Sequence, residues 1–372
     1  MIGSVLPSKL RALSRVISEG CTQCRACQVR CAFLRESGTP KDLADQALAG
    51  EQKLGRAFEC SLCGLCHAIC PMDLPLTEFF LTMRRAALES QAVSLTTYRS
   101  LLNYEAVGAS ALFRLVALPP EGDTVFFPGC TFPGAHPRTA LALYRHLRKA
   151  NPAIGLVLGC CFKPSHDLGR RNFFESRFNT LRLAMLARGV RTVLTACPNC
   201  FKVFSEYGDG LAVRNVLEVL EKNPPPRRTP VRGAAIVHTP CPFRFEKEHQ
   251  DIALKFARES GLDVNKNRQG GKMASCCGEG GTVGALRPDF ADAWTTQVEK
   301  SAKGRVIVTS CAGCAKFISR KTPAIHLLDL IFFPQAALDG TLPKPRGVTF
   351  YLYRLLFKWR VWIENRLRPD RG

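Results

Sequence analysis

The residues whose chemistry is most evident are two adjacent cysteines, Cys276 and Cys277, which glycines follow at 278, 280 and 281. Neighbouring side chains of an extended strand point to opposite faces, so two adjacent thiolates can serve one metal centre only where the backbone turns sharply. Glycine permits such a turn because it reaches positive φ without a steric penalty. Five thiols are therefore predicted to converge on one metal-cluster site, namely Cys241, Cys276, Cys277, Cys311 and Cys314.

The same arrangement occurs earlier in the chain, which indicates an internal duplication. Similar apolar stretches, 192–196 and 306–310, precede the closing cysteine pair of each copy. The earlier set consists of Cys130, Cys160, Cys161, Cys197 and Cys200.

Strands and helices are expected to alternate through both copies. Predicted strands at 124–127, 154–158, 192–195, 234–238 and 306–309 are separated by predicted helices such as 137–150, 170–188 and 245–260. This alternation is typical of an α/β fold with parallel sheets. Ligands of such sheets collect at the carboxyl ends of the strands, and each cysteine group of the first copy follows a predicted strand. One edge of that sheet is thus expected to gather all five thiolates, while in the second copy predicted strands precede Cys241 and Cys311.

Two further cysteine runs near the N-terminus have the C-x2-C-x2-C-x3-C spacing, at residues 21–31 and 60–70. They resemble the bacterial two-cluster ferredoxin, in which the fourth cysteine of each run reaches the other cluster. The resemblance implies one cubane [4Fe-4S] cluster on Cys21, Cys24, Cys27 and Cys70, and a second on Cys60, Cys63, Cys66 and Cys31. Paired zinc sites are the alternative, but zinc modules usually present ligands as separated pairs.

Composition places these thiols in a reducing compartment. The chain has 372 residues and 18 cysteines, and residues 1–20 lack the apolar core of a signal peptide. A disulfide framework belongs to short secreted chains, so we expect a cytoplasmic protein with metal-bound thiols. The net charge of +21 favours an anionic membrane or an acidic partner. No nucleic-acid recognition motif accompanies it, so nucleic acid is not an expected partner.

The duplicated cysteine pattern resembles the CCG domain pair of the heterodisulfide reductase family. Its fusion behind a two-cluster ferredoxin is similar to the D-type polypeptide of heterodisulfide reductase and to the C-type polypeptide of anaerobic glycerol-3-phosphate dehydrogenase. The resemblance implies up to two noncubane [4Fe-4S] clusters, each held by one of the five-cysteine sets. One departure is Phe162, which stands where the second copy has Gly278. A left-handed backbone at phenylalanine costs about 1–2 kcal/mol, so either that loop takes another conformation or its cluster differs.

Five segments are predicted. An α+β ferredoxin-like module spans 1–95, a helical connector 96–122, the first CCG domain 123–225, the second 226–340, and a basic aromatic tail 341–372. Residues 349–368 of the tail interleave aromatic and basic side chains. This pattern fits either contact with a membrane surface or packing on a partner subunit.

Two residues near the cysteine sets are candidates for proton transfer. His166 and Glu279 carry groups that thiol or quinone chemistry requires. The alternatives are a surface histidine and a loop carboxylate.

No flavin or nicotinamide motif is found, so electrons must come from a partner. The leading hypothesis is an electron-transfer subunit that links a flavoprotein or dehydrogenase to a membrane quinone or cytochrome b partner. Such a protein would lie peripherally on the inner face of the membrane. A second hypothesis is disulfide reduction at a noncubane cluster, and a third is a colourless structural zinc protein.

Overall fold

The N-terminal third of the chain is built from helices. The computed structural model describes residues 6–50, 54–226, 228–264 and 270–366. The helices of this part are α1 Ser8–Gly20, α2 Ala32–Ser37, α3 Pro40–Leu48, α4 Leu65–Ile69, α5 Leu76–Glu89 and α6 Arg99–Ala109, with 3-10 turns η1 Ala26–Gln28, η2 Leu54–Glu59 and η3 Thr96–Tyr98. Helix α3 begins with a capping box between Thr39 and Asp42 and has Pro40 in its first turn.

The first CCG region forms a five-stranded sheet in the order β1-β3-β2-β4-β5. Strands β2, β3, β4 and β5 are parallel, whereas β1 pairs antiparallel with β3 at the edge. The elements are β1 Leu115–Ala117, β2 Thr124–Phe127, α7 Phe132–Ala135, α8 Pro137–Ala150, β3 Gly155–Leu158, α9 Lys163–Asp167, α10 Arg171–Leu186, β4 Thr192–Thr195, α11 Pro198–Tyr207, β5 Ala212–Asn215 and α12 Val216–Lys222.

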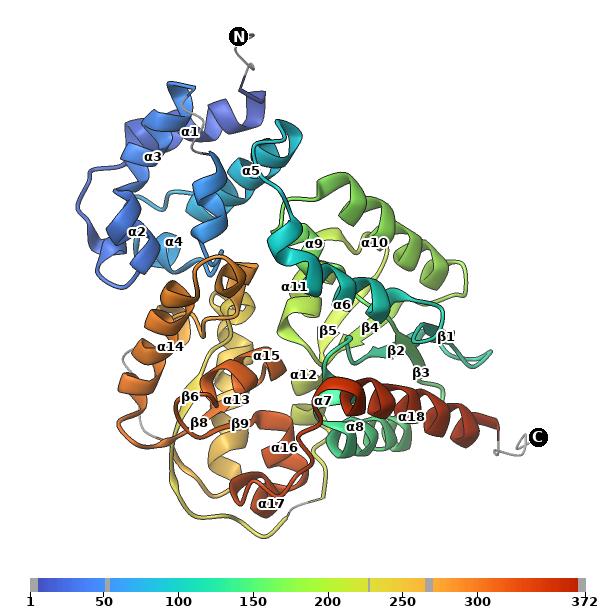
Figure 1. The fold of residues 1–372 in the computed structure, drawn as a ribbon. Helices are drawn as coiled ribbons and strands as arrows, with labels where there is room; N and C mark the ends of the chain where they lie inside the picture. The colour runs from blue at the N-terminus through green and yellow to red at the C-terminus, as the bar shows by residue number, and fades with distance from the viewer. Residues whose placement is uncertain (1–5, 51–53, 227, 265–269, 367–372) are drawn as a thin grey trace.

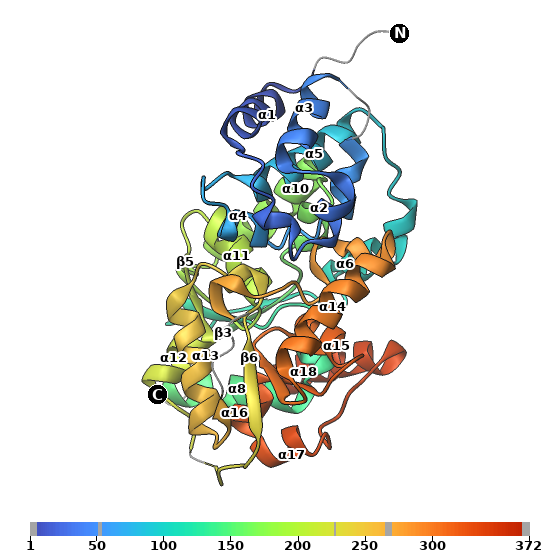
Figure 2. The same ribbon diagram turned by 90° about the vertical axis from the view of Figure 1, so that its left-hand side faces the viewer.

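The second CCG region forms a parallel four-stranded sheet in the order β7-β6-β8-β9. Its elements are β6 Ala234–His238, η4 Cys241–Phe243, α13 Lys247–Glu259, β7 Asp263–Val264, η5 Gly271–Met273, η6 Gly280–Ala285, α14 Pro288–Ala302, β8 Val306–Thr309, α15 Ala312–Ile318, β9 Ala324–His326, α16 Leu327–Phe332 and α17 Pro334–Leu338. Figure 1 shows this region below the N-terminal helices and beside the first sheet, and Figure 2 shows the N-terminal helices above both CCG regions.

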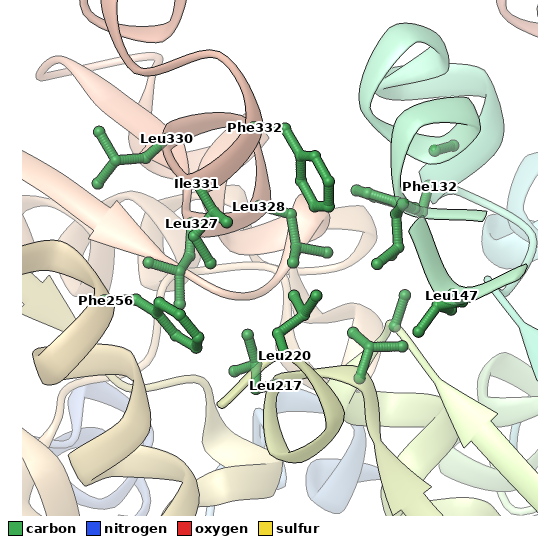
Figure 3. Close-up of a cluster of buried hydrophobic side chains, with 14 of the residues drawn as sticks. Phe132, Leu147, Leu217, Leu220, Phe256, Leu327, Leu328, Leu330, Ile331 and Phe332 are labelled. Carbon is green, nitrogen blue, oxygen red and sulfur yellow. The ribbon is translucent and has the colours of Figure 1, made fainter. Parts of the chain in front are cut away.

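The two sheets share one hydrophobic core. Alternate residues of a strand face opposite sides, so Phe126 of β2 packs into the shared core while Val125 and Phe127 pack under α10 and α11. In the second sheet, Val308 joins the shared core. Leu217 and Leu220 of α12 meet side chains of α13 and α16 there, as Figure 3 shows. The two CCG regions are therefore packed face to face.

The last helix, α18 Gly347–Arg366, packs on the first CCG region through α7 and α8. Phe357 and Val361 are buried, while Trp359 is 61% exposed. The tail thus covers its own chain with one face and exposes another, and its end at 367–372 lies outside the described residues. None of the helices in the described ranges is long and apolar enough to cross a membrane.

Two expectations need correction. Strands were expected in the N-terminal module, but its described residues before Leu115 form helices, turns and loops only. The cysteine loops are there held by flanking helices rather than by a sheet. Residues 115–117, expected in a helical connector, form β1, because these three apolar residues pair antiparallel with β3 at the edge of the sheet.

Candidate iron–sulfur site

The N-terminal cysteines lie in the two groups that the ferredoxin spacing predicts. Cys21, Cys24, Cys27 and Cys70 line one small cavity, and Cys31, Cys60, Cys63 and Cys66 line another. The pKa of the Cys27 thiol is raised to about 11, by burial first and then by the nearby thiols of its group. Thiols so hard to ionise give up their protons when a metal binds, because only the thiolate is a ligand.

The second five-cysteine set also comes together in the structure. Cys276 and Cys314 hold the pKa of Cys277 well below its ordinary value by hydrogen bonding. Cys241 lies beside Cys276, and Cys311 beside Cys314. Gly278 makes the turn after the pair at φ 97°, and a side chain there would meet the Ala291 carbonyl.

The first five-cysteine set is assembled in the same way. The Cys200 and Cys161 sulfurs are 3.4 Å apart, and Cys160 lies within hydrogen-bonding reach of Cys130. Cys197 caps α11, and the pKa of its thiol is lowered by a hydrogen bond from Cys200 and by backbone N–H groups of the first turn. This is the effect expected where a helix N-terminus meets a thiolate.

Phe162 adopts the left-handed conformation, with φ 57° and ψ 25°. Its N–H donates to the Cys160 sulfur at 3.3 Å, as the N–H of Gly278 does to Cys276 at 3.4 Å. The loops of the two copies therefore turn alike. The sequence left open whether the loop at Phe162 takes another conformation or its cluster differs, and the structure shows that the loop does not take another conformation. Edge-to-face packing on Phe173 accompanies the strained backbone of Phe162.

The four cysteine groups lie one beside the next in a series. Cys27 contributes to the raised pKa of Cys66, which links the two N-terminal groups. Hydrogen bonds from Cys241 and Cys276 hold the pKa of Cys63 well below its ordinary value, so the second N-terminal group touches the second CCG set. Finally, the Cys311 thiol lies close enough to Cys197 for their charges to interact. The order is first N-terminal group, second N-terminal group, second CCG set, first CCG set.

Buried cations surround these thiols, and they provide a test of whether anionic clusters fit. Arg84 is fully buried and donates to five backbone carbonyls, among them that of Cys60. Arg244, 1% exposed, donates to the carbonyls of Cys63, Lys272 and Ala274. A buried charge without a counterion is costly, and iron–sulfur clusters bound to thiolates are anionic. The residues present therefore fit iron–sulfur clusters.

Buried polar atoms without a partner in the described residues also indicate that an anionic cluster fits at both CCG sets. Arg354 of α18 lies beside Cys130, and its Nη1 is buried with no hydrogen-bond partner among the described residues. His238 lies beside Cys277, and its Nε2 is likewise buried without a partner in that part of the chain. Each supplies an N–H that a cluster sulfide or thiolate can accept. Within the described residues, no group of three or more His, Cys, Asp or Glu side chains is arranged to hold a single metal ion.

Glu279 and His166 occupy different surroundings. Glu279 lies between the two CCG sets, and its pKa is raised to about 8 by burial first and then by the charges of Cys277 and Cys197. His166 is buried, and its ring contacts Asp167 at 2.9 Å and the Tyr207 hydroxyl at 3.0 Å. The part of either residue in proton transfer stays a prediction.

Sequence reasoning missed several residues that contact the thiols. The Tyr104 hydroxyl in α6 donates to the Cys130 sulfur at 3.4 Å, and Arg84, Arg244, Arg354 and His238 were not singled out. Two adjacent arginines, Arg84 and Arg85, lie inside the apolar pattern of 76–89, and this is a signal that points to Arg84 without separating it from Arg85. The others depend on contacts between distant segments, which no local pattern reveals.

Comparison with known families agrees with this arrangement. The 4Fe-4S dicluster domain matches residues 20–75, and the CCG cysteine-rich domain matches residues 124–205 and 235–319. The chain belongs to the iron–sulfur proteins that join a dicluster domain to two CCG domains. The resemblance drawn from the cysteine spacing is thereby confirmed.

Individual relatives are distant. A fumarate reductase (CoM/CoB) subunit from Methanothermobacter marburgensis is 24% identical over 358 residues, covering 84% of this chain and 72% of that protein. An uncharacterized iron–sulfur protein from Methanocaldococcus jannaschii is 22% identical over 306 residues, covering 73% of this chain and 61% of its own length. Among solved structures, an aspartate racemase homologue from Pyrococcus horikoshii OT3 has a TM-score of 0.24 and 10% identity, covering 59% of this chain and 99% of that chain, and carries no argument about fold or function.

Proposed function

We propose that this protein is the iron–sulfur electron-transfer subunit of a membrane-associated oxidoreductase complex. It relays electrons between a partner flavoprotein or dehydrogenase and a quinone or cytochrome b partner. The observation that carries the proposal is the contact of Cys63 with Cys241 and Cys276, which joins the N-terminal thiol groups to the CCG sets without a break.

The proposed cofactors are two cubane [4Fe-4S] clusters and up to two noncubane [4Fe-4S] clusters. Their ligands are the four cysteine groups described above, and when bound the clusters supply single electrons. In this proposal the residues of the chain hold the clusters in series, bury the adjacent cysteine pairs of both CCG sets and compensate negative charge through Arg84 and Arg244. Electrons would enter at the N-terminal groups, which lie at one end of the series.

Glu279 is proposed to deliver protons between the two CCG sets, since it lies beside both. The protein is proposed to act at the inner face of the membrane, where the exposed aromatic face of α18 supports peripheral contact.

Disulfide reduction at a CCG cluster is a second candidate. The relative from Methanothermobacter marburgensis bears CoM/CoB in its name. Glu279 lies near cysteines of both CCG sets, where it could supply a proton to a thiolate released from a disulfide. In heterodisulfide reductase, by resemblance, the special cluster divides one two-electron reduction into single-electron steps.

Reoxidation of the reduced holoprotein separates the two candidates. The protein is purified anaerobically, its visible absorbance is bleached with dithionite, and either a short-chain quinone or a small disulfide is added. Recovery of the absorbance with quinone supports electron transfer. Recovery with disulfide alone would overturn it in favour of the reductase.

A further inference from the structure

A groove of about 830 Å³ runs over the first CCG region between α6 and α10. Its walls are Ala106 and Ala109 of α6 and Leu181 and Ala184 of α10, and the edge strand β1 contributes Leu115. Figure 1 shows α6, α10, β1 and α18 on the same side of the molecule. Cavities of this size and apolar character hold small organic ligands.

The groove reaches the first CCG set at Cys160. Cys160 and Phe162 line it directly, and Cys160 is only 2% exposed, so a ligand in the groove would cover it. Glu105 also lines the groove and is held by the backbone N–H and hydroxyl of Ser165. A ligand bound here would lie in contact with a cysteine of the first CCG set, one of the proposed cluster ligands.

One end of the groove continues into an exposed apolar surface. Leu115 is shared with a second depression of about 510 Å³ that Leu112, Leu355, Trp359 and Trp362 also line. Leu112 and Trp359 are each 61% exposed. An apolar path therefore runs from Cys160 to the outer face of α18. Aromatic side chains in such positions are typical of the membrane interface.

Basic side chains stand around this path. Arg114, Arg177 and Arg188 line the groove, and Lys358 lines the outer depression, whereas Glu105 is the acidic residue of the groove. Cations beside an apolar surface fit an anionic lipid headgroup layer. A compact anionic disulfide would not use the apolar depression that Leu355, Trp359 and Trp362 of α18 line, whereas a ligand with an apolar tail would.

We infer that the α6–α10 groove binds a lipid-soluble quinone, with its ring toward Cys160 and its apolar tail leading out past Leu115 toward Trp359. The inference rests on the proposed electron-transfer function and adds the site at which this chain itself meets the carrier. The quinone gains two electrons, delivered one at a time by way of the first CCG set, and two protons from solvent, and becomes the hydroquinone. No bond to the protein forms or breaks, and the partner dehydrogenase is the source of the electrons.

Binding is tested on the oxidised holoprotein by equilibrium dialysis against a benzoquinone with a ten-carbon tail. Ala184→Trp fills the groove from α10, and Leu183→Trp places the same indole side chain at the adjacent position, where leucine is 55% exposed. We expect Ala184→Trp to weaken binding at least tenfold, about 1.4 kcal/mol, and Leu183→Trp to leave the dissociation constant within twofold of the parent. Ala106→Trp fills the groove from the opposite wall and serves if the first variant does not fold.

The tail is tested by chain length. Replacing the ten-carbon tail by a methyl group is expected to weaken binding to the parent protein at least fivefold, and Trp359→Ser is expected to reduce this difference. Equal binding to the parent and to both groove-filling variants would overturn the inference. Quinone-driven reoxidation with unchanged rates in those variants would overturn the groove while leaving the proposed function intact, whereas reoxidation of the parent by a small disulfide and not by quinone would overturn both.

Discussion

Arg84 is predicted to hold the three parts of the chain together. Its guanidinium donates to carbonyls of Ala57, Phe58 and Cys60 in the N-terminal part, and to carbonyls of Asp167 and Gly281 in the two CCG regions. Hydrogen bonds from a charged donor contribute about 1.5–3 kcal/mol each, and an orphaned buried acceptor costs about 1–3 kcal/mol. These values do not add, because water reaches some carbonyls after substitution. Arg84→Met is therefore expected to lose about 3–5 kcal/mol, the range for removing one partner of a buried charge network.

The assay is guanidinium unfolding of the holoprotein under anaerobic conditions, followed by circular dichroism and by the visible absorbance of the clusters. Arg171→Met is the matched control, because Arg171 is exposed and its side chain forms an ion pair with Glu175 on the same helix, at 2.9 Å. A pair of this kind contributes about 0.3–0.5 kcal/mol. A loss below about 1 kcal/mol in Arg84→Met, or a loss equal to that of the control, would show that Arg84 does not hold the three parts together.

Three further predictions follow from single contacts. Tyr104→Phe removes the hydroxyl that donates to the Cys130 sulfur, so the reduction potential of the first CCG cluster should fall in a redox titration. The free energy of unfolding should fall by about 1 kcal/mol. An unchanged potential would contradict this prediction. Gly313→Ala places a methyl group against the Glu279 carboxylate, which must then move away. The EPR signal of the second CCG cluster should change, while the free energy of unfolding stays within about 1 kcal/mol of the parent. An unaltered EPR signal would contradict this prediction. Burial, with help from the nearby His136, lowers the pKa of His326 from 6.5 to about 3, so below pH 6.5 the unfolded chain binds a proton that the folded chain does not bind. The free energy of unfolding should therefore fall by about 1.4 kcal/mol for each pH unit from pH 6 to pH 4. His326→Gln should flatten this slope in acid unfolding curves, and an unchanged slope excludes the histidine as its cause.

Much of the fold was predictable because each central strand is a short apolar run that ends at a cysteine motif. The strands 124–127, 192–195, 234–238 and 306–309 begin and end where the sequence predicts. The grouping of the first five-cysteine set was predictable for the same reason, since thiols that follow parallel strands meet at one sheet edge, whereas the N-terminal groups were predictable from their spacing. The strand β1 was missed because its apolar run of 3 residues is too short to be distinguished from the end of the helical connector that precedes it.

Contacts between distant segments could not be predicted from local patterns. The approach of Cys63 to Cys241 depends on how the N-terminal helices dock on the second CCG region. The same holds for Arg354, which reaches Cys130 only because α18 folds back over the first region. For the tail, the sequence left membrane contact and packing on a partner subunit open, and the structure adds packing on its own chain through Phe357 and Val361.

A relay through four clusters is tested most directly by anaerobic iron and sulfide analysis with low-temperature EPR, on the holoprotein and on the Cys276→Ala, Cys277→Ala variant. We predict about sixteen irons per chain, with one distinct signal lost in the variant while the N-terminal signals persist. About eight irons, with spectra indifferent to the substitution, would confine the redox groups to the N-terminal part and contradict a relay through the CCG sets.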